Sequence, residues 1–438
     1  MYCQLEVLRH CFPSTVLRIL EELPESLGET YERILREIRK PNQGHAHRLL
    51  QCLVAAVRPL EVKELAEVLA FDFDTEGIPK LNLGWRWEDQ EEAVMSACSS
   101  LVMIVKHGDS RIVQFSHFSV KEFLTASRLA EPIRDVSRYH IRLEAAHTIL
   151  VQACLGVLLR LDDRIDRDNI EGFPLARYAA RYWPTHARME NVSSRVKLVK
   201  DGMECLFDAD KPHFATWLWI YDHGQWGRSM STMSPEKPEA LPLYYAAMLG
   251  LLGLAEHLIA KHPEHVNADG GLLGTAIQAA ALEGHSDILS LLIKHGADIN
   301  GCGRHGCTPL HRASQNGRLK AGQLLLNNGA DINFQSNYNY TALIYAASYG
   351  HVEFARMLLD SWALINVRGD YGKTALHWAV INGRVESVRL LLEYGADFNV
   401  RDNSGKTPFR LASLHGHQEM VELMSTCGAE SVEAQRLL

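Results

Sequence analysis

The C-terminal half of the chain repeats one pattern of polar and apolar positions with a period of 33 residues. In each unit a threonine precedes a short apolar segment, a glycine follows that segment, and a second apolar segment ends before an asparagine. The repeated positions are Thr275, Thr308, Thr341, Thr374 and Thr407, then Gly284, Gly317, Gly350, Gly383 and Gly416, then Asn300, Asn333, Asn366 and Asn399. A fixed period of this length predicts stacked units of two helices each.

The threonines, glycines and turns of these units have separate physical roles. Threonine accepts hydrogen bonds at a helix N-terminus, and glycine ends a helix in the left-handed conformation. Positive φ is expected at four turn tips: Gly306, Gly372, Gly405 and Asn339. Trp362 stands where other units have glycine, which predicts that its turn is built differently.

Residues 307–333 (CTPLHRASQNGRLKAGQLLLNNGADIN) and 373–399 (KTALHWAVINGRVESVRLLLEYGADFN) resemble ankyrin repeats. The resemblance covers roughly 240–430 and implies two antiparallel helices per unit, followed by a hairpin-like finger. It also implies that His311 hydrogen-bonds across to such threonines. Gln278, Ile344 and Arg410 replace this histidine in other units, so we expect the polar bridge to be missing there.

The N-terminal half contains apolar residues at helical spacing, followed by two short β-type runs. Helices are predicted after a capping-box pattern at Ser26–Glu29 and at 47–57, 62–70 and 88–98, with a break at Arg58-Pro59-Leu60. Strands are predicted at 101–105 and 111–115 around the turn His107–Ser110, and Ser119–Glu122 is read as a second capping box. Three helices and a hairpin are typical of a winged helix.

This half resembles the segment that follows the nucleotide-binding core in fungal NACHT-ankyrin proteins, NLR-like relatives of the STAND signalling ATPases. The resemblance is carried by 23–38, 49–74, 113–124, 173–183 and 210–222. The chain has no G-x-x-x-x-G-K-[ST] loop to cradle phosphates, and no apolar strand ending in Asp-Asp precedes residue 23. We therefore expect the ATPase to be absent, either because the gene is truncated or because that part lies upstream.

The predicted fold class is mainly α: a winged-helix-like region, a helical spacer and an ankyrin-repeat solenoid. The predicted domains are 1–40, a helical remnant that follows a NACHT-type module; 41–130, winged-helix-like; 131–239, the spacer; 240–430, about six ankyrin units with atypical first and last members; and 431–438, a tail. Spacer helices are expected at 141–160, 173–187, 193–207 and 214–221.

Composition and charge narrow the function. A chain of 438 residues with 47% hydrophobic residues is not disordered throughout, and a net charge of −8 argues against a nucleic-acid-coating protein. The third winged-helix segment carries Glu88-Asp89 and Glu91-Glu92 where a DNA reader needs bases. Nine scattered cysteines, no secretory signal and apolar runs too short to span a bilayer predict a cytoplasmic protein that binds no nucleic acid and has no membrane span.

Two sequence clusters suggest chemistry. Cys302, His305, Cys307 and His311 are metal-ligand types, but their spacing matches no common zinc module, so a reduced finger loop is predicted. His117 and Ser119 are a base and a hydroxyl, but Ser119 is interpreted as a helix cap and no G-x-S-x-G elbow occurs. We therefore predict no catalytic residue, no cofactor and no metal.

The variable surface of the repeats is the predicted functional site, because aromatic and arginine side chains dominate interface energies. The predicted partner-binding residues are Arg312, Gln315, Tyr338, Tyr340, Tyr345, Tyr349, Tyr371, Trp378, Ile381 and Asn382. Packing between repeats is an alternative role for Tyr345 and Trp378.

Three functions are consistent with these features. The preferred one is a non-enzymatic scaffold or sensor that binds a partner protein, in fungal non-self recognition by analogy with the resembling family. The alternative is a fragment of an NTP-dependent NACHT switch whose ATPase lies upstream. A substrate adaptor for a degradation complex is a third, although no ligase-docking motif is visible.

Overall fold

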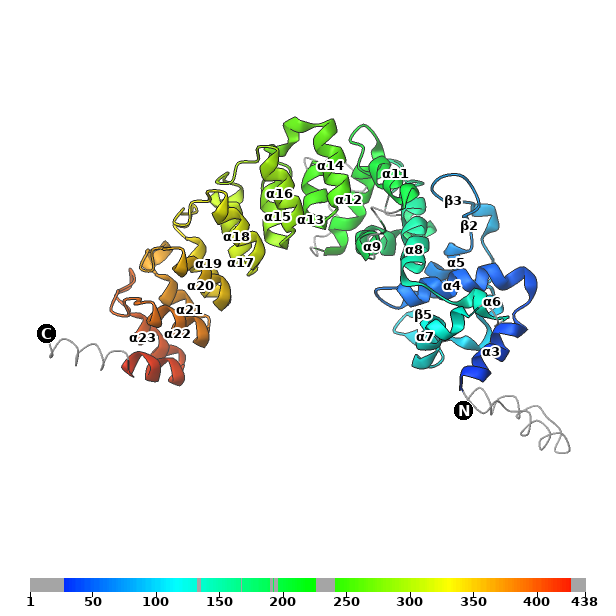
Figure 1. Ribbon diagram of the computed structural model, residues 1–438, viewed down its shortest axis with the longest axis horizontal. Helices are drawn as coiled ribbons and strands as arrows, with labels where there is room; N and C mark the ends of the chain where they lie inside the picture. Colours follow the sequence, from blue (N-terminus) through cyan, green and yellow to red (C-terminus); the bar gives the residue numbers. More distant parts are fainter. Residues whose placement is uncertain are drawn as a thin grey trace. The chain divides into compact units, whose positions relative to one another are not determined.

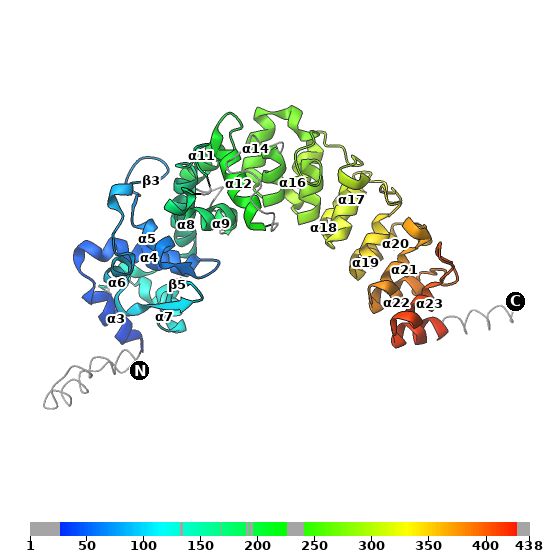
Figure 2. The same ribbon diagram turned by 180° about the vertical axis from the view of Figure 1, so that it is seen from behind.

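The computed structural model describes residues 27–131, 135–166, 168–189, 192, 196–225 and 241–426 (Figures 1 and 2). The chain divides into two compact units, Met1–Pro238 and Glu239–Leu438. The described part is mostly helical, as predicted. Two predicted features, the helix cap at Ser26 and the tail at 431–438, lie outside the described residues.

In the first unit, α3 (Leu27–Glu37) lies in the predicted 1–40 segment and precedes the predicted winged helix. The three helices of the winged helix are α4 (Gln43–Ala55), α5 (Val62–Val68) and α6 (Gln90–Cys98), and its hairpin is β4 (Val102–His107) with β5 (Ser110–Phe115). A short strand β1 (Leu60–Glu61) completes an antiparallel sheet in the order β1-β5-β4. The predicted break between helices at Arg58–Leu60 is confirmed, since α4 ends at Ala55 and α5 begins at Val62. Within this break Leu60 is fully buried and pairs with Val113 of β5.

Strands β2 (Phe71–Asp72) and β3 (Lys80–Leu81) form a second, two-stranded sheet after α5. Helix α7 (Phe118–Thr125) follows the β4–β5 hairpin. Its N-cap is His117, whose ring accepts a hydrogen bond from the Ser119 backbone, so the predicted cap at Ser119 is wrong. The Ser119 hydroxyl instead bonds to the Tyr31 hydroxyl at 2.8 Å and so ties α7 to α3.

The described residues of the predicted spacer contain four α-helices, α8 (Leu143–Leu158), α9 (Ala176–Arg188), α11 (Lys197–Leu206) and α12 (Pro212–Gln225). Both views show α8 beside α9 (Figures 1 and 2). Trp183, Phe207 and Trp217 fill the core between α9, α11 and α12, with ring centroids 5.2 to 6.3 Å apart. Because α8 also packs on α4, the winged helix and the spacer share one hydrophobic core.

The second unit is a stack of helix pairs (Figure 1). The pairs are α13 (Pro242–Leu249) with α14 (Leu252–Lys261), α15 (Ala276–Glu283) with α16 (Ser286–Lys294), α17 (Pro309–Gln315) with α18 (Leu319–Asn327), α19 (Ala342–Tyr349) with α20 (Val352–Asp360), and α21 (Ala375–Ile381) with α22 (Val385–Glu393). A last pair comprises α23 (Pro408–His415) and a helical segment at 418–426. First helices pack on first helices of the next repeat, and second helices on second helices, as expected for a solenoid.

The polar bridge at the start of the repeats occurs in more units than predicted. In α17 the His311 ring accepts a hydrogen bond from the Thr308 N–H at 3.0 Å and donates one to the Tyr340 carbonyl at 2.8 Å. In α15 the Gln278 amide forms the same kind of bridge, from the Thr275 N–H to the Gly301 and Cys307 carbonyls. The prediction that Gln278 lacks the bridge is wrong, because an amide offers an acceptor and a donor as a neutral imidazole does.

The turn at Trp362 is also built differently from the prediction. Trp362 adopts the left-handed conformation itself, with φ of 68°, close to the 91° of Gly329 and the 81° of Gly395 in equivalent turns. Its N–H bonds to the Leu359 carbonyl at 3.0 Å, as the Gly329 N–H bonds to the Leu326 carbonyl at 3.1 Å. The stack therefore imposes one turn geometry even on a residue with a Cβ atom.

Among the described residues, no helix combines the length and the apolar character needed to cross a membrane.

Candidate partner-binding surface

The fingers of the repeats form a continuous backbone-bonded platform. Short 3-10 turns, Arg304–Gly306 and Asp370–Gly372, shape two of the finger tips. Each tip accepts a hydrogen bond from the next finger: Asn337 N–H to His305, Asp370 N–H to Tyr338 and Asn403 N–H to Tyr371, at 2.8 to 2.9 Å. These bonds hold successive tips in register, so side chains on different repeats keep fixed spacings.

The finger tips have the positive φ angles that the sequence predicts. The angles are 67° at Gly306, 56° at Asn339, 68° at Gly372 and 77° at Gly405. His305 and Tyr371 also have positive φ, although a side chain at such a position costs about 1 kcal/mol or more. Tyr371 is thus held in a strained backbone conformation with its side chain 67% exposed.

Five predicted site residues gather into one group, which we call the aromatic row: Tyr338, Tyr340, Tyr345, Tyr371 and Trp378. The Tyr340 ring lies at the centre, with centroids 6.1 Å from Tyr338, 5.7 Å from Tyr345 and 5.6 Å from Trp378. The contacts with Tyr345 and Trp378 are edge-to-face, a favoured arrangement of aromatic pairs. The row combines residues of two fingers with residues of α19 and α21.

A lysine connects Tyr371 to the rest of the aromatic row. The Lys373 ammonium lies 5.0 Å from the Tyr371 ring centroid and 5.8 Å from that of Trp378, within cation–π range. Asp402 holds this ammonium at 3.6 Å. Burial alone would raise the pKa of Asp402, but hydrogen bonds from Ser404 and Lys406 and the charge of Lys373 lower it to about 2.

The aromatic row has an exposed part and a supporting part. Tyr338 and Tyr371 are 41% and 67% exposed, whereas Tyr340, Tyr345 and Trp378 are half-buried. Burial raises the pKa of Tyr340 to about 12 and also raises that of Tyr345, so both hydroxyls stay protonated near neutral pH. The two exposed tyrosines can contact a partner, and the other three position them.

The remaining predicted site residues do not join the aromatic row. Arg312 is buried beneath the fingers, where its guanidinium donates to the Arg304 carbonyl at 3.1 Å and to Gln315 at 3.3 Å. Gln315, Tyr349, Ile381 and Asn382 lie at the C-terminal ends of α17, α19 and α21. Tyr349 is exposed there and stacks on His351, away from the tips.

The Cys302–His311 cluster does not assemble into a metal site among the described residues. Cys302 is exposed, whereas the Cys307 sulfur is buried and lies 3.5 Å from the Tyr345 hydroxyl. His311 is committed to the bridge between Thr308 and Tyr340, and burial lowers its pKa to about 4. A group that the sequence analysis missed does converge: His262, Glu264 and His265, whose His-x-Glu-His spacing was the available signal.

His117 and Ser119 are in hydrogen-bond contact, although the sequence analysis predicts no catalytic role for either residue. The His117 Nδ1 atom is 2.7 Å from the Ser119 oxygen, which also contacts Tyr31. Both groups are thereby engaged in holding α7 against α3, His117 as the helix cap and Ser119 through Tyr31. The residues that line the described recesses do not include them.

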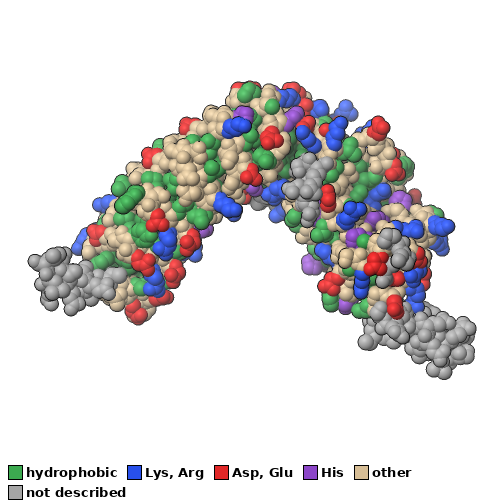
Figure 3. Space-filling view, in the orientation of Figure 1, with side chains coloured by type: hydrophobic (Ala, Val, Ile, Leu, Met, Phe, Trp, Pro, Cys, Tyr) green, Lys and Arg blue, Asp and Glu red, His purple; other side chains and the backbone are tan. Residues whose placement is uncertain are grey.

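A recess of about 690 Å³ lies between the hairpin and the start of α6 in the winged helix. Its acidic lining residues, Glu61, Glu88, Asp89, Glu91 and Asp109, outnumber the basic residues Lys63 and Arg111. On the face shown in Figure 3, basic and acidic side chains are interspersed over both units, without a continuous basic area. The recess thus presents mostly negative charge.

Comparison with protein families identifies both the helix-pair stack of the second unit and the winged helix of the first. Residues 243–336, 323–402 and 363–435 match ankyrin repeats. Residues 31–132 match the winged helix domain of GPI inositol-deacylase. The second unit is thus an ankyrin solenoid and the first carries a winged helix domain, and the ankyrin repeats support a role in protein interaction.

A curated relative is the azaphilone pigments biosynthesis cluster protein L of Monascus ruber, which is 34% identical over 290 residues. The match covers 63% of this chain and 60% of the relative. The chain therefore matches less than two thirds of the length of that relative.

Proposed function

We infer that this protein is a non-enzymatic interaction scaffold whose ankyrin fingers bind a partner protein through the aromatic row. The observation that carries this inference is the strained, 67% exposed Tyr371 beside Lys373 and the half-buried Trp378. Exposed aromatic residues fixed by a rigid supporting layer lose little conformational entropy on binding, so they make efficient anchors.

The partner would present acceptor groups and an apolar segment to the fingers. A tyrosine hydroxyl can donate a hydrogen bond, while its ring face covers apolar side chains. The acidic recess in the winged helix would repel nucleic-acid phosphates, which supports the proposal of a protein partner.

The finer proposal is that the solenoid is the sensing part of an NLR-like system in a fungus and acts in the cytoplasm. It rests on the likeness of the N-terminal half to NACHT-ankyrin proteins and on the match to the winged helix domain. The name of the Monascus relative gives its gene cluster and no molecular activity. Sequencing of the transcript upstream of Met1 tests this step: an in-frame phosphate-binding loop supports it, and an unrelated upstream domain contradicts it.

The binding role is tested by photo-crosslinking in cells of the source organism. A photoreactive phenylalanine replaces Tyr338 or Tyr371 in the full chain, and the matched control carries it at Tyr394, an exposed tyrosine that follows a second helix. One partner protein is expected to crosslink from both finger positions and not from Tyr394. Equal crosslinking at all three positions would contradict the finger assignment.

The same pair of tyrosines then provides the affinity test with the purified partner. Each of Tyr338→Ala and Tyr371→Ala is expected to weaken binding about 30-fold, because an aromatic anchor contributes about 2 kcal/mol. Tyr394→Ala should bind as the native chain does. Unchanged affinity of the Tyr338→Ala/Tyr371→Ala double variant, with a native circular dichroism spectrum, rules the aromatic row out.

A further inference from the structure

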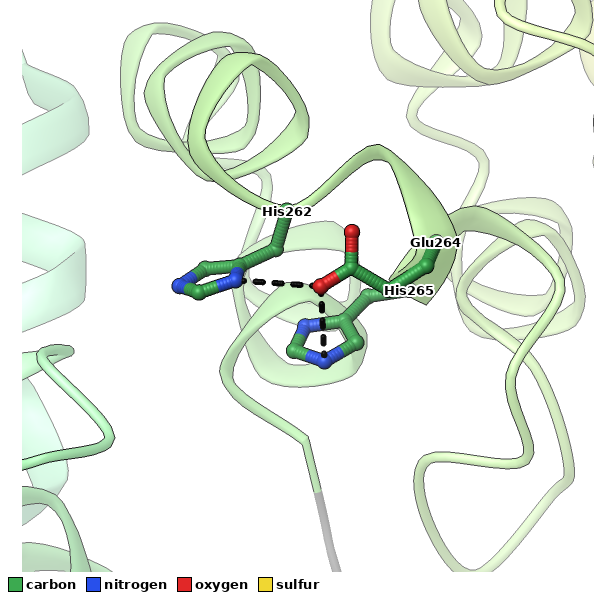
Figure 4. A group of neighbouring side chains, drawn as sticks. All are labelled: His262, Glu264 and His265. Atoms are coloured by element: carbon green, nitrogen blue, oxygen red, sulfur yellow. Dashed lines mark hydrogen bonds and ion pairs between the residues drawn. The ribbon is translucent and has the colours of Figure 1, made fainter.

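Three potential metal ligands converge at the end of the first ankyrin repeat (Figure 4). Helix α14 ends at Lys261, and His262 closes it with a backbone hydrogen bond to Leu258 at 2.8 Å. The chain then enters a 3-10 turn, Pro263–Val266, in which the His265 N–H bonds to the His262 carbonyl at 3.1 Å. Side chains three residues apart in such a turn lie on the same side, so both imidazoles project together.

The glutamate between the histidines lies within reach of both rings. Its Oε1 atom is 3.2 Å from His262 Nδ1 and 3.8 Å from His265 Nε2, and the three ligand atoms all lie within 4.8 Å of one another. The two imidazole rings are nearly parallel, with centroids 4.8 Å apart. Figure 4 shows both histidines directed toward the same carboxylate oxygen.

These spacings approach those of a tetrahedral zinc site. Zinc binds imidazole nitrogen and carboxylate oxygen at about 2.0–2.2 Å, which places neighbouring ligand atoms about 3.3–3.5 Å apart. The two measured distances to Glu264 bracket this range, so binding requires mainly that the histidine nitrogens approach each other. The buried Val266 and the fixed φ of Pro263 hold the turn while the side chains adjust.

The ligand types also favour a late transition metal. The site offers two imidazole nitrogens and one carboxylate oxygen. Imidazole ligands suit zinc and other late transition metals, whereas magnesium and calcium prefer all-oxygen sites.

We propose that His262, Glu264 and His265 bind one zinc ion at the C-terminal end of α14. The three protein ligands leave a fourth coordination position that faces solvent, since the Glu264 side chain is 64% exposed. Water or a ligand from another molecule completes the tetrahedron there. This proposal is independent of the aromatic row, which belongs to the later repeats.

The test is a zinc titration of the full chain, stripped of metal and kept reduced with a phosphine. The His262→Asn/His265→Asn double variant is expected to bind one zinc ion fewer per chain than the native protein. Glu264→Gln should weaken the same site by at least about tenfold. The matched control is His295→Asn, an exposed histidine at the equivalent end of α16 that belongs to no described metal-ligand cluster, and it should bind as the native chain does.

Cobalt replaces zinc as a spectroscopic probe that separates this site from cysteine sites. The difference between the native and double-variant spectra should show d–d bands without thiolate charge-transfer absorption, because all three ligands are nitrogen or oxygen. Equal zinc stoichiometry and affinity in the native and double-variant chains would overturn the proposal, as would a thiolate band in the difference spectrum. The His262 and His265 side chains are 32% and 25% exposed, so circular dichroism of the double variant is needed to confirm an unchanged fold.

Discussion

At the scale of single residues, the repeat position determines conformation and bonding more strongly than the residue type does. Gln278 makes the bridge that His311 makes, and Trp362 adopts the turn conformation that Gly329 adopts. Both were predicted from residue type to differ. The backbone of the stack had already defined which donors, acceptors and φ angles each position must supply.

The strained turn at Trp362 can be relieved by substitution. Trp362→Gly is expected to raise the free energy of unfolding by about 0.5–1 kcal/mol, because glycine tolerates a φ of 68° without the Cβ clash. Urea denaturation of both chains measures the change. Trp362→Ala keeps the strain and should bring no gain, and Gly395→Ala, with φ of 81° and open space around the new Cβ, should lose about 1 kcal/mol. A gain equal to that of glycine in Trp362→Ala would assign the effect to the exposed ring.

The buried His311 should make stability depend on pH. Its pKa is lowered to about 4 by burial, against an ordinary value of about 6.5 in the unfolded chain. The unfolded state therefore binds more protons between these values. Stability from this group is fully present above pH 6.5 and falls, by at most about 3 kcal/mol, as the pH drops to 4.

The variant His311→Gln isolates this contribution, because Gln278 shows that glutamine can make the bridge. Its stability at pH 7 should lie within about 1 kcal/mol of native, since the bridge is retained. Between pH 7 and pH 5, guanidinium denaturation should show a smaller stability loss than in the native chain. Parallel pH curves for the two proteins would show that His311 titrates normally in the folded state.

At the scale of elements, helices with strong apolar periodicity were predicted within a few residues of their ends, and the two-residue strands were not. Strand β1 follows Pro59 and spans only Leu60–Glu61, which is too short to show any alternation. Its conformation depends on pairing with β5, which comes about 50 residues later in the chain. The N-cap of α7 was misplaced for a related reason. The Ser119 hydroxyl bonds to Tyr31 of α3, a helix that lies far away in the sequence.

Packing between second helices depends on a glycine that the sequence analysis did not single out. A Cβ at Gly322 of α18 would lie 2.5 Å from the Phe354 ring of α20. Gly322→Ala should therefore lower the free energy of unfolding by about 1–3 kcal/mol, although alanine favours helix. The control Gly253→Ala in α14 meets no atom within 4 Å and should be neutral or stabilising by roughly 0.5 kcal/mol. Thermal unfolding measures the stability of both variants. Equal melting temperatures of Gly322→Ala and Gly253→Ala would mean that α20 shifts to accommodate the new methyl group.

At the scale of the whole molecule, the chain divides into two compact units, Met1–Pro238 and Glu239–Leu438. The ankyrin unit is stabilised by contacts between successive repeats, so its cohesion is local along the chain. The first unit is different, because α4 and α8 bring the predicted winged helix and spacer into one core.

This division predicts that residues 239–438 fold on their own. The fragment should have a helical circular dichroism spectrum and a cooperative urea transition, since these residues form one compact unit of stacked repeats. A shorter fragment, 352–438, begins at α20 without its partner α19 and retains fewer than three complete helix pairs. It should lose cooperative unfolding. Cooperative unfolding of both fragments would show that stability does not depend on complete repeats.

The sequence alone determined the repeat, its caps and turn tips, the winged helix and the aromatic residues from which the site is drawn. These features depend on residues close together in the chain, where periodicity and capping act directly. Tertiary structure decided which of the candidate residues come into contact. The Tyr340 ring contacts those of Tyr338, Tyr345 and Trp378. Arg312 is instead buried, and Tyr349 lies outside the aromatic row. Periodicity places a side chain on a face of its own helix, but only the stacking of neighbouring repeats brings two faces into contact and separates supporting rings from exposed ones.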